Sequence, residues 1–226
     1  MGNKNWQLSP SDFAFLWEDC KRCFYLKVNS FYRPRSIMPK IFTIIDGEMK
    51  KFFKEKQLEK VVVGFPAGKV EFGERWVESS AISMPGLSST CTIKGKFDTV
   101  VRFNDGSYGI IDFKTAETKS EHIPLYSRQL HAYAHALENP STGALALKPI
   151  TKLGLLVYEP NNFLMHTNQS ASLSGRLSWI EIQRNDKDFL RFLKEVVTVL
   201  EQPKPPGGNP ACEWCKYRDT SRRIGL

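Results

Sequence analysis

The chain has 226 residues, of which 41% are hydrophobic and 25% are charged, and this predicts one folded domain covering residues 1–226. Its formal net charge of +8 favours a polyanionic partner. No apolar run approaches the roughly 20 residues of a membrane-spanning helix, so no membrane partner is expected. Residues 1–7 lack an apolar signal core, and we therefore expect a cytoplasmic protein whose cysteines are in a reducing compartment.

Helices and strands alternate along the predicted chain. A first helix begins at Pro10, with Ser9 as its N-cap, and its apolar residues continue at helical spacing to Phe24. Apolar periodicity and turn residues then predict a helix at 40–58, a strand at 61–65, an irregular strand pair at 69–83, a hairpin at 89–113, a helix at 122–138, strands at 152–158 and 176–184, and a helix at 186–201. This order favours a mixed α/β sheet flanked by helices.

The hairpin carries an unusual set of charged residues. Its two strands are rich in β-branched and aromatic side chains, and the Asn-Asp-Gly sequence at 104–106 is a strong turn signal between them. Asp98, Asp112 and Lys114 nevertheless lie within these strands. Because side chains alternate along a strand, Asp112 and Lys114 point to the same face. A divalent metal ion held by the two carboxylates, with the lysine beside it, is the simplest explanation.

Glu48 interrupts an apolar face of the helix predicted at 40–58. Ile41, Ile45, Met49 and Phe52 share that face at about 100° per residue, and Glu48 falls in the middle of it. A carboxylate on a buried face is costly unless it is paired or bound to a metal. Two interpretations therefore remain open: a salt bridge with a lysine or a place near the sheet edge, or a third acidic ligand that faces the hairpin.

Four of the five cysteines form two C-x-x-C pairs at opposite ends of the chain: Cys20 with Cys23, and Cys212 with Cys215. Four thiolates make a closed tetrahedral site that suits a [4Fe–4S] cluster and Zn²⁺ equally well. Such a centre would join residues 1–26 to residues 203–217 over the sheet, in a structural role. The alternative is four core cysteines without a metal, which is also our interpretation of Cys91.

The charged hairpin is one part of an ordered pattern of motifs. Gly95-x-x-Asp98 precedes Ile-Ile-Asp112-Phe-Lys114-Thr, and Gln129-x-x-x-Tyr133 follows in the next predicted helix. Together these motifs resemble the RecB-like branch of the PD-(D/E)XK nuclease superfamily. Residues 8–11, 20–26 and 212–217 resemble the signatures at the two ends of the small single-domain exonucleases associated with CRISPR adaptation. The resemblance extends from about residue 8 to residue 217.

The resemblance implies a restriction-endonuclease-like fold, with a mixed central sheet flanked by helices, and a specific metal site. Asp98 and Asp112 would bind Mg²⁺ or Mn²⁺ together with the backbone carbonyl of Phe113, since hard cations prefer oxygen ligands. The metal would lower the pKa of a bound water and neutralise charge on the scissile phosphate. Lys114 would orient that water or stabilise the pentavalent oxyanion.

Further expectations come from the same resemblance. Gln129 and Tyr133 would line the site and position the DNA backbone. The implied activity is that of a Mg²⁺- or Mn²⁺-dependent exonuclease acting on single-stranded DNA ends in repair, recombination or CRISPR adaptation. Its partners would be DNA and the proteins of such a complex. The alternative is a catalytically inactive nucleic-acid-binding or complex-assembly module on the same fold.

The sequence departs from the family pattern in two places. Relatives commonly have a metal-binding histidine four residues after a glycine in the second helix, but counting from Gly47 leads to Lys51, whose ammonium cannot bind a metal. Glu48 could substitute, or the site could be inactive. Relatives with an iron–sulfur cluster contribute one amino-terminal and three carboxy-terminal cysteines. In this sequence Ser221 lies near the position expected for the third tail cysteine, and Cys23 takes the place of that missing cysteine. The resemblance favours a [4Fe–4S] cluster at the four cysteines, with Zn²⁺ as the alternative.

Overall fold

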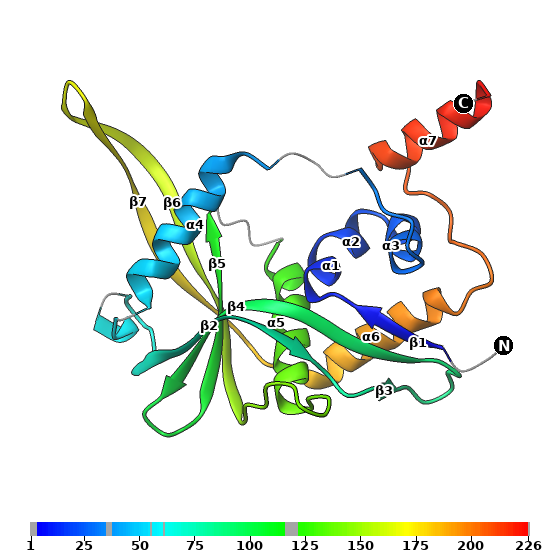
Figure 1. Ribbon diagram of the computed structural model, residues 1–226, viewed down its shortest axis with the longest axis horizontal. Coiled ribbons are helices and arrows are strands. Elements are labelled where there is room, and N and C mark those ends of the chain that lie inside the picture. Colours follow the sequence, from blue (N-terminus) through cyan, green and yellow to red (C-terminus); the bar gives the residue numbers. More distant parts are fainter. Residues whose placement is uncertain (1–3, 35–37, 55, 61, 116–121, 226) are drawn as a thin grey trace.

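The computed structural model describes residues 4–34, 38–54, 56–60, 62–115 and 122–225, and its centre is a mixed sheet (Figure 1). The strands within these residues are β1 Asn5–Leu8, β2 Gly68–Glu78, β3 Ile82–Ser83, β4 Thr90–Phe103, β5 Tyr108–Thr115, β6 Ile150–Thr167 and β7 Ser170–Ile182. The sheet order is β1-β4-β5-β6-β7, and β2 and β3 also pair with β4. Two pairings, β1 with β4 and β5 with β6, are parallel. The predicted mixed α/β fold is therefore confirmed.

Helices pack on both faces of this sheet. They are α1 Pro10–Ala14, α2 Leu16–Asp19, α3 Lys21–Val28, α4 Lys40–Phe53, the 3₁₀ helix η1 Leu58–Lys60, α5 Ile123–Glu138, α6 Asp186–Leu200 and α7 Glu213–Arg223. The larger core joins α1–α3, α5 and α6 to one face, where it includes Val100 and Ile110. A smaller core joins the end of α4 and the segment after it to the other face, where it includes Val101 and Ile111. The alternation of strand side chains separates the two cores.

The β4–β5 hairpin that carries the acidic residues forms as predicted. Thr99 pairs with Ile111 and Arg102 with Tyr108 in antiparallel register. Gly106 in the turn has φ +86°, a backbone conformation that favours glycine. The strands at 152–158 and 176–184 are also present, but they extend into a long β6–β7 hairpin that projects beyond the sheet (Figure 1).

The first predicted helix is three short helices instead. Cys20 has extended backbone angles, φ −166° and ψ 107°, and separates α2 from α3. Ser9 makes no side-chain cap to the backbone, and its hydroxyl contacts that of Ser11 at 3.0 Å. Helical spacing of apolar residues is preserved when short helices follow one another, so periodicity alone did not reveal the breaks.

The region from 40 to 83 contains the largest differences from prediction. Helix α4 ends at Phe53, and the strand predicted at 61–65 is wrong, because residues 62–64 form a bend and turns; Val61 lies outside the described residues. The apolar stripe of α4 is not buried either: Ile41 and Phe52 are 52% and 53% exposed. Strands β2 and β3 pair with β4 and not with each other.

Strand β1, the 3₁₀ helix η1 and the terminal helix α7 were not predicted from the sequence. Strand β1 is only four residues long and lies parallel to β4. Helix α7 starts immediately after Cys212, and in Figure 1 it lies beside α2 and α3, on the opposite side of the molecule from the β6–β7 hairpin. No helix within the described ranges is long and apolar enough to span a membrane.

Candidate active site and four-cysteine centre

Asp98 and Asp112 are neighbours across the β4–β5 hairpin. The pairing of Thr99 with Ile111 places the two aspartates at the next position of the antiparallel register. Asp98 Oδ2 accepts a hydrogen bond from the backbone N–H of Phe113 at 3.1 Å, which ties its carboxylate to the residue after Asp112. The Phe113 ring points to the opposite face and stacks on Phe53 of α4. The hairpin thus brings both predicted carboxylates together.

Asp112 is buried and is held by two further residues of the predicted set. Gln129 Nε2 on α5 donates to Asp112 Oδ1 at 3.1 Å, and the Lys114 ammonium forms an ion pair with Asp112 Oδ2. Burial raises the pKa of Asp112 to about 6, although the charge of Lys114 opposes this shift. Burial would lower the pKa of Lys114, but Asp112 outweighs it and the pKa is raised.

Among the described residues, the buried Gln129 Oε1 has no hydrogen-bond donor, and Asp112 Oδ2 has only the Lys114 ammonium as its partner. A buried acceptor without a donor is costly, and oxygen atoms of this kind are the ligands that Mg²⁺ and Mn²⁺ prefer. The carboxylates of Asp98 and Asp112 and the buried oxygen without a donor therefore fit a divalent cation.

Tyr133 lies one turn after Gln129 on α5 and contacts strand β4. Its hydroxyl donates to the backbone carbonyl of Lys96 at 2.7 Å, two residues before Asp98. Burial raises the pKa of Tyr133, so the hydroxyl stays protonated at neutral pH. A Cβ on Gly95 would lie 2.7 Å from Pro10 Cδ and 3.2 Å from Tyr133 Cε1. Close packing of α1 and α5 on β4 therefore explains the glycine of the Gly-x-x-Asp motif.

Lys50 of α4 occupies a cluster of carboxylates that sequence reasoning missed. Its ammonium lies 2.8 Å from each of three acidic groups: Asp46, Glu74 and Asp98. Burial opposes protonation of Lys50, but these carboxylates raise its pKa. Hydrogen bonds from Lys50 and Lys96 lower the pKa of Glu74 to about 2. The available signal was the i, i+4 spacing of Asp46 and Lys50, which places both on one face of a helix.

Glu48 does not face the hairpin, and its prediction as a third acidic ligand was wrong. Its carboxylate pairs with Lys51 at 2.7 Å, and the two side chains are 67% and 76% exposed. Glu48 is two positions from both Asp46 and Lys50, so it points about 200° away from their face. Lys50, not Lys51, is the residue of this helix that reaches Asp98.

The four cysteines of the C-x-x-C pairs come together as a buried cluster. Cys20 Sγ lies 3.6 Å from Cys215 Sγ, and Cys23 Sγ lies 3.7 Å from Cys215 Sγ and 3.8 Å from Cys212 Sγ. All four sulfur atoms lie within 4.8 Å of one another. At a Zn–S distance of about 2.3 Å, a tetrahedral ion separates its sulfur ligands by about 3.8 Å. The spacing thus fits one tetrahedral ion.

Arginines donate to two of these sulfurs and backbone groups favour a thiolate at Cys20, whereas burial raises the pKa of Cys23 and of Cys215. Arg33 Nη2 donates to Cys212 Sγ at 3.3 Å and Arg218 Nη2 to Cys215 Sγ at 3.8 Å. Burial would raise the pKa of Cys20, but backbone hydrogen bonds, first from Asn209, outweigh it and lower the pKa to about 7. Cys91 lies apart in β4, where burial raises its pKa to about 12. The centre therefore contains the four predicted cysteines.

One of three comparisons with known proteins identifies the family of this chain. The model of the PD-(D/E)XK nuclease superfamily matches residues 40–220. Comparison with curated proteins found no match. The crystal structure of SSO0001 is 17% identical, with a TM-score of 0.43 over 88% of this chain and 79% of that chain. Because the family model matches most of its length, the chain belongs to the PD-(D/E)XK nuclease superfamily.

Proposed function

We propose that this protein is a Mg²⁺- or Mn²⁺-dependent deoxyribonuclease, with residues 1–226 acting as one nuclease-like domain. The observation that supports it most directly is the buried Asp112, which lies beside Asp98, pairs with Lys114 and is bonded to Gln129. Superfamily membership supports hydrolysis of a phosphodiester bond. The net charge of +8 favours a nucleic-acid substrate.

Each residue of the site has a distinct role in this proposal. Asp98, Asp112 and the backbone carbonyl of Phe113 would hold the divalent cation. When bound, the cation would supply an activated water and neutralise charge on the scissile phosphate. Lys114 would orient that water or stabilise the oxyanion. Gln129 would position the Asp112 carboxylate through the hydrogen bond to Oδ1, which is a narrower role than contact with the DNA backbone.

Tyr133 is proposed as a positioning residue as well. Its hydroxyl is bonded to β4 at Lys96, so its effect on the reaction would pass through the placement of Asp98. Within this proposal the substrate is DNA with single-stranded ends. The order of the motifs from Gly95 to Tyr133 supports the RecB-like branch and a relationship to the small exonucleases of repair, recombination or CRISPR adaptation.

The test is a cleavage assay on end-labelled DNA. Purified protein is incubated with single-stranded and double-stranded substrates in the presence of Mn²⁺, Mg²⁺ or EDTA. We expect metal-dependent shortening of the single strand from its end and no product in EDTA. DNA binding without cleavage in either metal would support the second candidate, a non-catalytic nucleic-acid-binding module.

The position of Lys50 favours this second candidate, the non-catalytic nucleic-acid-binding module. Its ammonium already lies 2.8 Å from Asp98 Oδ1, so one ligand of the proposed metal is paired with an internal cation. A divalent ion must compete with that charge for the carboxylate. The proposed nuclease therefore requires that Mg²⁺ or Mn²⁺ displace the ammonium from Asp98 or share the carboxylate with it.

Replacing Lys50 by methionine is expected to tighten Mn²⁺ binding by about tenfold, because the competing ammonium is removed while the aliphatic chain is retained. Titration of free Mn²⁺ by electron paramagnetic resonance measures the affinity. Lys51→Met is the matched control, since Lys51 is the next residue, is exposed and pairs with Glu48. Unchanged or weaker binding in Lys50→Met would contradict competition for Asp98.

For the four-cysteine centre we propose one Zn²⁺. The family resemblance favoured a [4Fe–4S] cluster, in which the four thiolates bind separate iron atoms and stand farther apart than around one ion. Three sulfur–sulfur distances of 3.6–3.8 Å, with all four sulfurs within 4.8 Å of one another, support the single ion. Two C-x-x-C pairs, with Ser221 at the expected tail position, also depart from the one-plus-three cysteine pattern of the cluster-containing relatives.

A further inference from the structure

Exposed aromatic side chains gather around the amino-terminal helices and α7. Phe15, Phe31, Tyr32 and Tyr217 are 50%, 69%, 72% and 72% exposed. Large apolar side chains are usually shielded from water, and a contiguous group of exposed ones marks a binding surface. Two cavities in this region show that these residues form a continuous surface.

The two cavities share Tyr32 and Arg33. The first, of about 860 Å³, extends from these residues to Phe15 and Leu125. The second, of about 460 Å³, extends from them to Trp214 and Tyr217 beside the four-cysteine centre. A single track thus runs from Phe15, past Tyr32, to α7.

The inner end of this track reaches the candidate active site. The Phe15 ring lies 5.6 Å from the Tyr126 ring in an edge arrangement. Lys114 Nζ lies 4.8 Å from the centre of the Tyr126 ring and 5.9 Å from that of Phe15. A ligand that follows the track therefore arrives at the lysine that pairs with Asp112.

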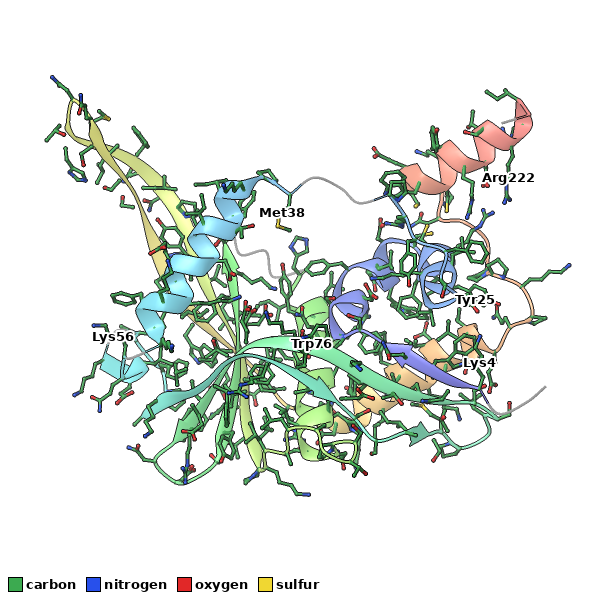
Figure 2. All side chains as sticks on the ribbon, in the orientation of Figure 1. Lys4, Tyr25, Met38, Lys56, Trp76 and Arg222 are labelled. Atoms are coloured by element: carbon green, nitrogen blue, oxygen red, sulfur yellow. The ribbon has the colours of Figure 1, made fainter. Side chains whose placement is uncertain are left out.

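The charge along the track is positive at its outer end. The second cavity is lined by three arginines and by no carboxylate among the residues that the structure describes, but Arg33 pairs with Asp19 and Arg218 lies 3.7 Å from Asp219, so the positive charge there comes mainly from Arg222. Figure 2 shows Arg222 on α7. The acidic residues of the first cavity are neutralised by ion pairs: Asp12 with Lys27, Glu18 with Arg128 and Asp19 with Arg33.

We propose that a single strand of nucleic acid lies in this track, with its bases on Tyr32 and Tyr217 and its phosphates near Arg222. Exposed aromatic faces combined with arginines are the features that bind single strands without sequence preference, because every unpaired base has a free face. A duplex keeps its bases stacked internally and cannot use these faces. The proposed course of the strand, from α7 to Lys114, rests on the proposed nuclease function.

Binding of a labelled twelve-nucleotide single-stranded DNA, measured by fluorescence anisotropy without added Mg²⁺ or Mn²⁺, tests the proposal without cleavage and leaves the four-cysteine centre intact. Tyr32→Ala and Tyr217→Ala are each expected to weaken binding at least about fivefold, from the loss of one stacking platform. Phe163→Ala is the matched control, because Phe163 is an equally exposed aromatic, at 70%, on the β6–β7 hairpin. It should bind as the wild type does. Thermal unfolding of each variant checks that it is folded.

If both tyrosine variants bind the single strand with wild-type affinity, the proposed track is wrong. An equal loss of affinity for a blunt duplex of the same length would overturn its preference for single strands. The proposed nuclease function can fail separately from the track. If the wild-type protein binds the strand through Tyr32 and Tyr217 but does not cleave it with Mn²⁺, the track is supported and the nuclease function is contradicted. If a variant without both tyrosines cleaves at the wild-type rate, the nuclease function is supported and the track is contradicted.

Discussion

Asp112→Asn is expected to reduce metal-dependent DNA cleavage by at least about a thousandfold. The substitution removes the charge that would hold the cation but keeps the shape and one oxygen for the hydrogen bond from Gln129 Nε2. Glu48→Gln is the control, because Glu48 is exposed and paired with Lys51, and it should cleave at the wild-type rate. Initial rates on end-labelled single-stranded DNA with Mn²⁺ measure both.

The same substitution distinguishes a catalytic role from a structural one. Burial raises the pKa of Asp112 from 3.8 to about 6, so the folded state holds the proton more tightly than the unfolded state. The ionised carboxylate therefore destabilises the metal-free fold at pH 7, by on the order of 1–3 kcal/mol, and this cost fades as the pH falls from about 6 towards 4. In EDTA near pH 7, Asp112→Asn should unfold at the wild-type temperature or above it.

Two outcomes would contradict this assignment. Cleavage by Asp112→Asn at the wild-type rate would place the chemistry elsewhere in the chain. Loss of cleavage together with a clearly lower unfolding temperature in EDTA would show that the side chain acts mainly in folding. Only loss of activity with retained stability supports Asp112 as a metal ligand.

The second large effect is expected at the four-cysteine centre. Cys215→Ala should lower the free energy of unfolding by at least about 3 kcal/mol, because it removes a ligand from a structural metal whose binding is coupled to folding. The centre joins residues that are far apart in the sequence: Cys20 and Cys215 are separated by 195 positions and their sulfurs by 3.6 Å. Without the metal, α7 would keep the ion pair of Asp219 with Arg22 of α3 but lose the link through the cysteines.

Thermal unfolding and metal analysis of the purified protein test this expectation. We expect one zinc per chain, no visible absorption band, and a loss of stability on treatment with a strong chelator. Cys91→Ala is the control, since Cys91 is buried in β4 and lies apart from the other four sulfurs; it should cost no more than about 1 kcal/mol. A coloured protein containing iron would overturn the zinc assignment. Full stability of Cys215→Ala, with no metal in the wild type, would overturn the structural role.

The sequence by itself identified the residues whose arrangement depends on local geometry. A tight Asn-Asp-Gly turn between two β-rich segments is sufficient to pair β4 with β5, and this pairing places Asp98 beside Asp112. Strand alternation then places Lys114 on the face of Asp112, and one helical turn relates Gln129 to Tyr133. The four cysteines were likewise identified from spacing, because two C-x-x-C pairs form an unusual pattern that suits a metal ion.

Only the tertiary structure decided how α4 meets this hairpin. Its amphipathic pattern predicted a buried stripe around Glu48, yet Phe53 is the only residue of α4 that is buried in the described structure. The rotation of a helix about its axis is set by what it packs against, and here it places Lys50 rather than Lys51 or Glu48 at Asp98. The breaks around Cys20 and the length of the β6–β7 hairpin likewise depend on distant contacts, which a local pattern does not contain.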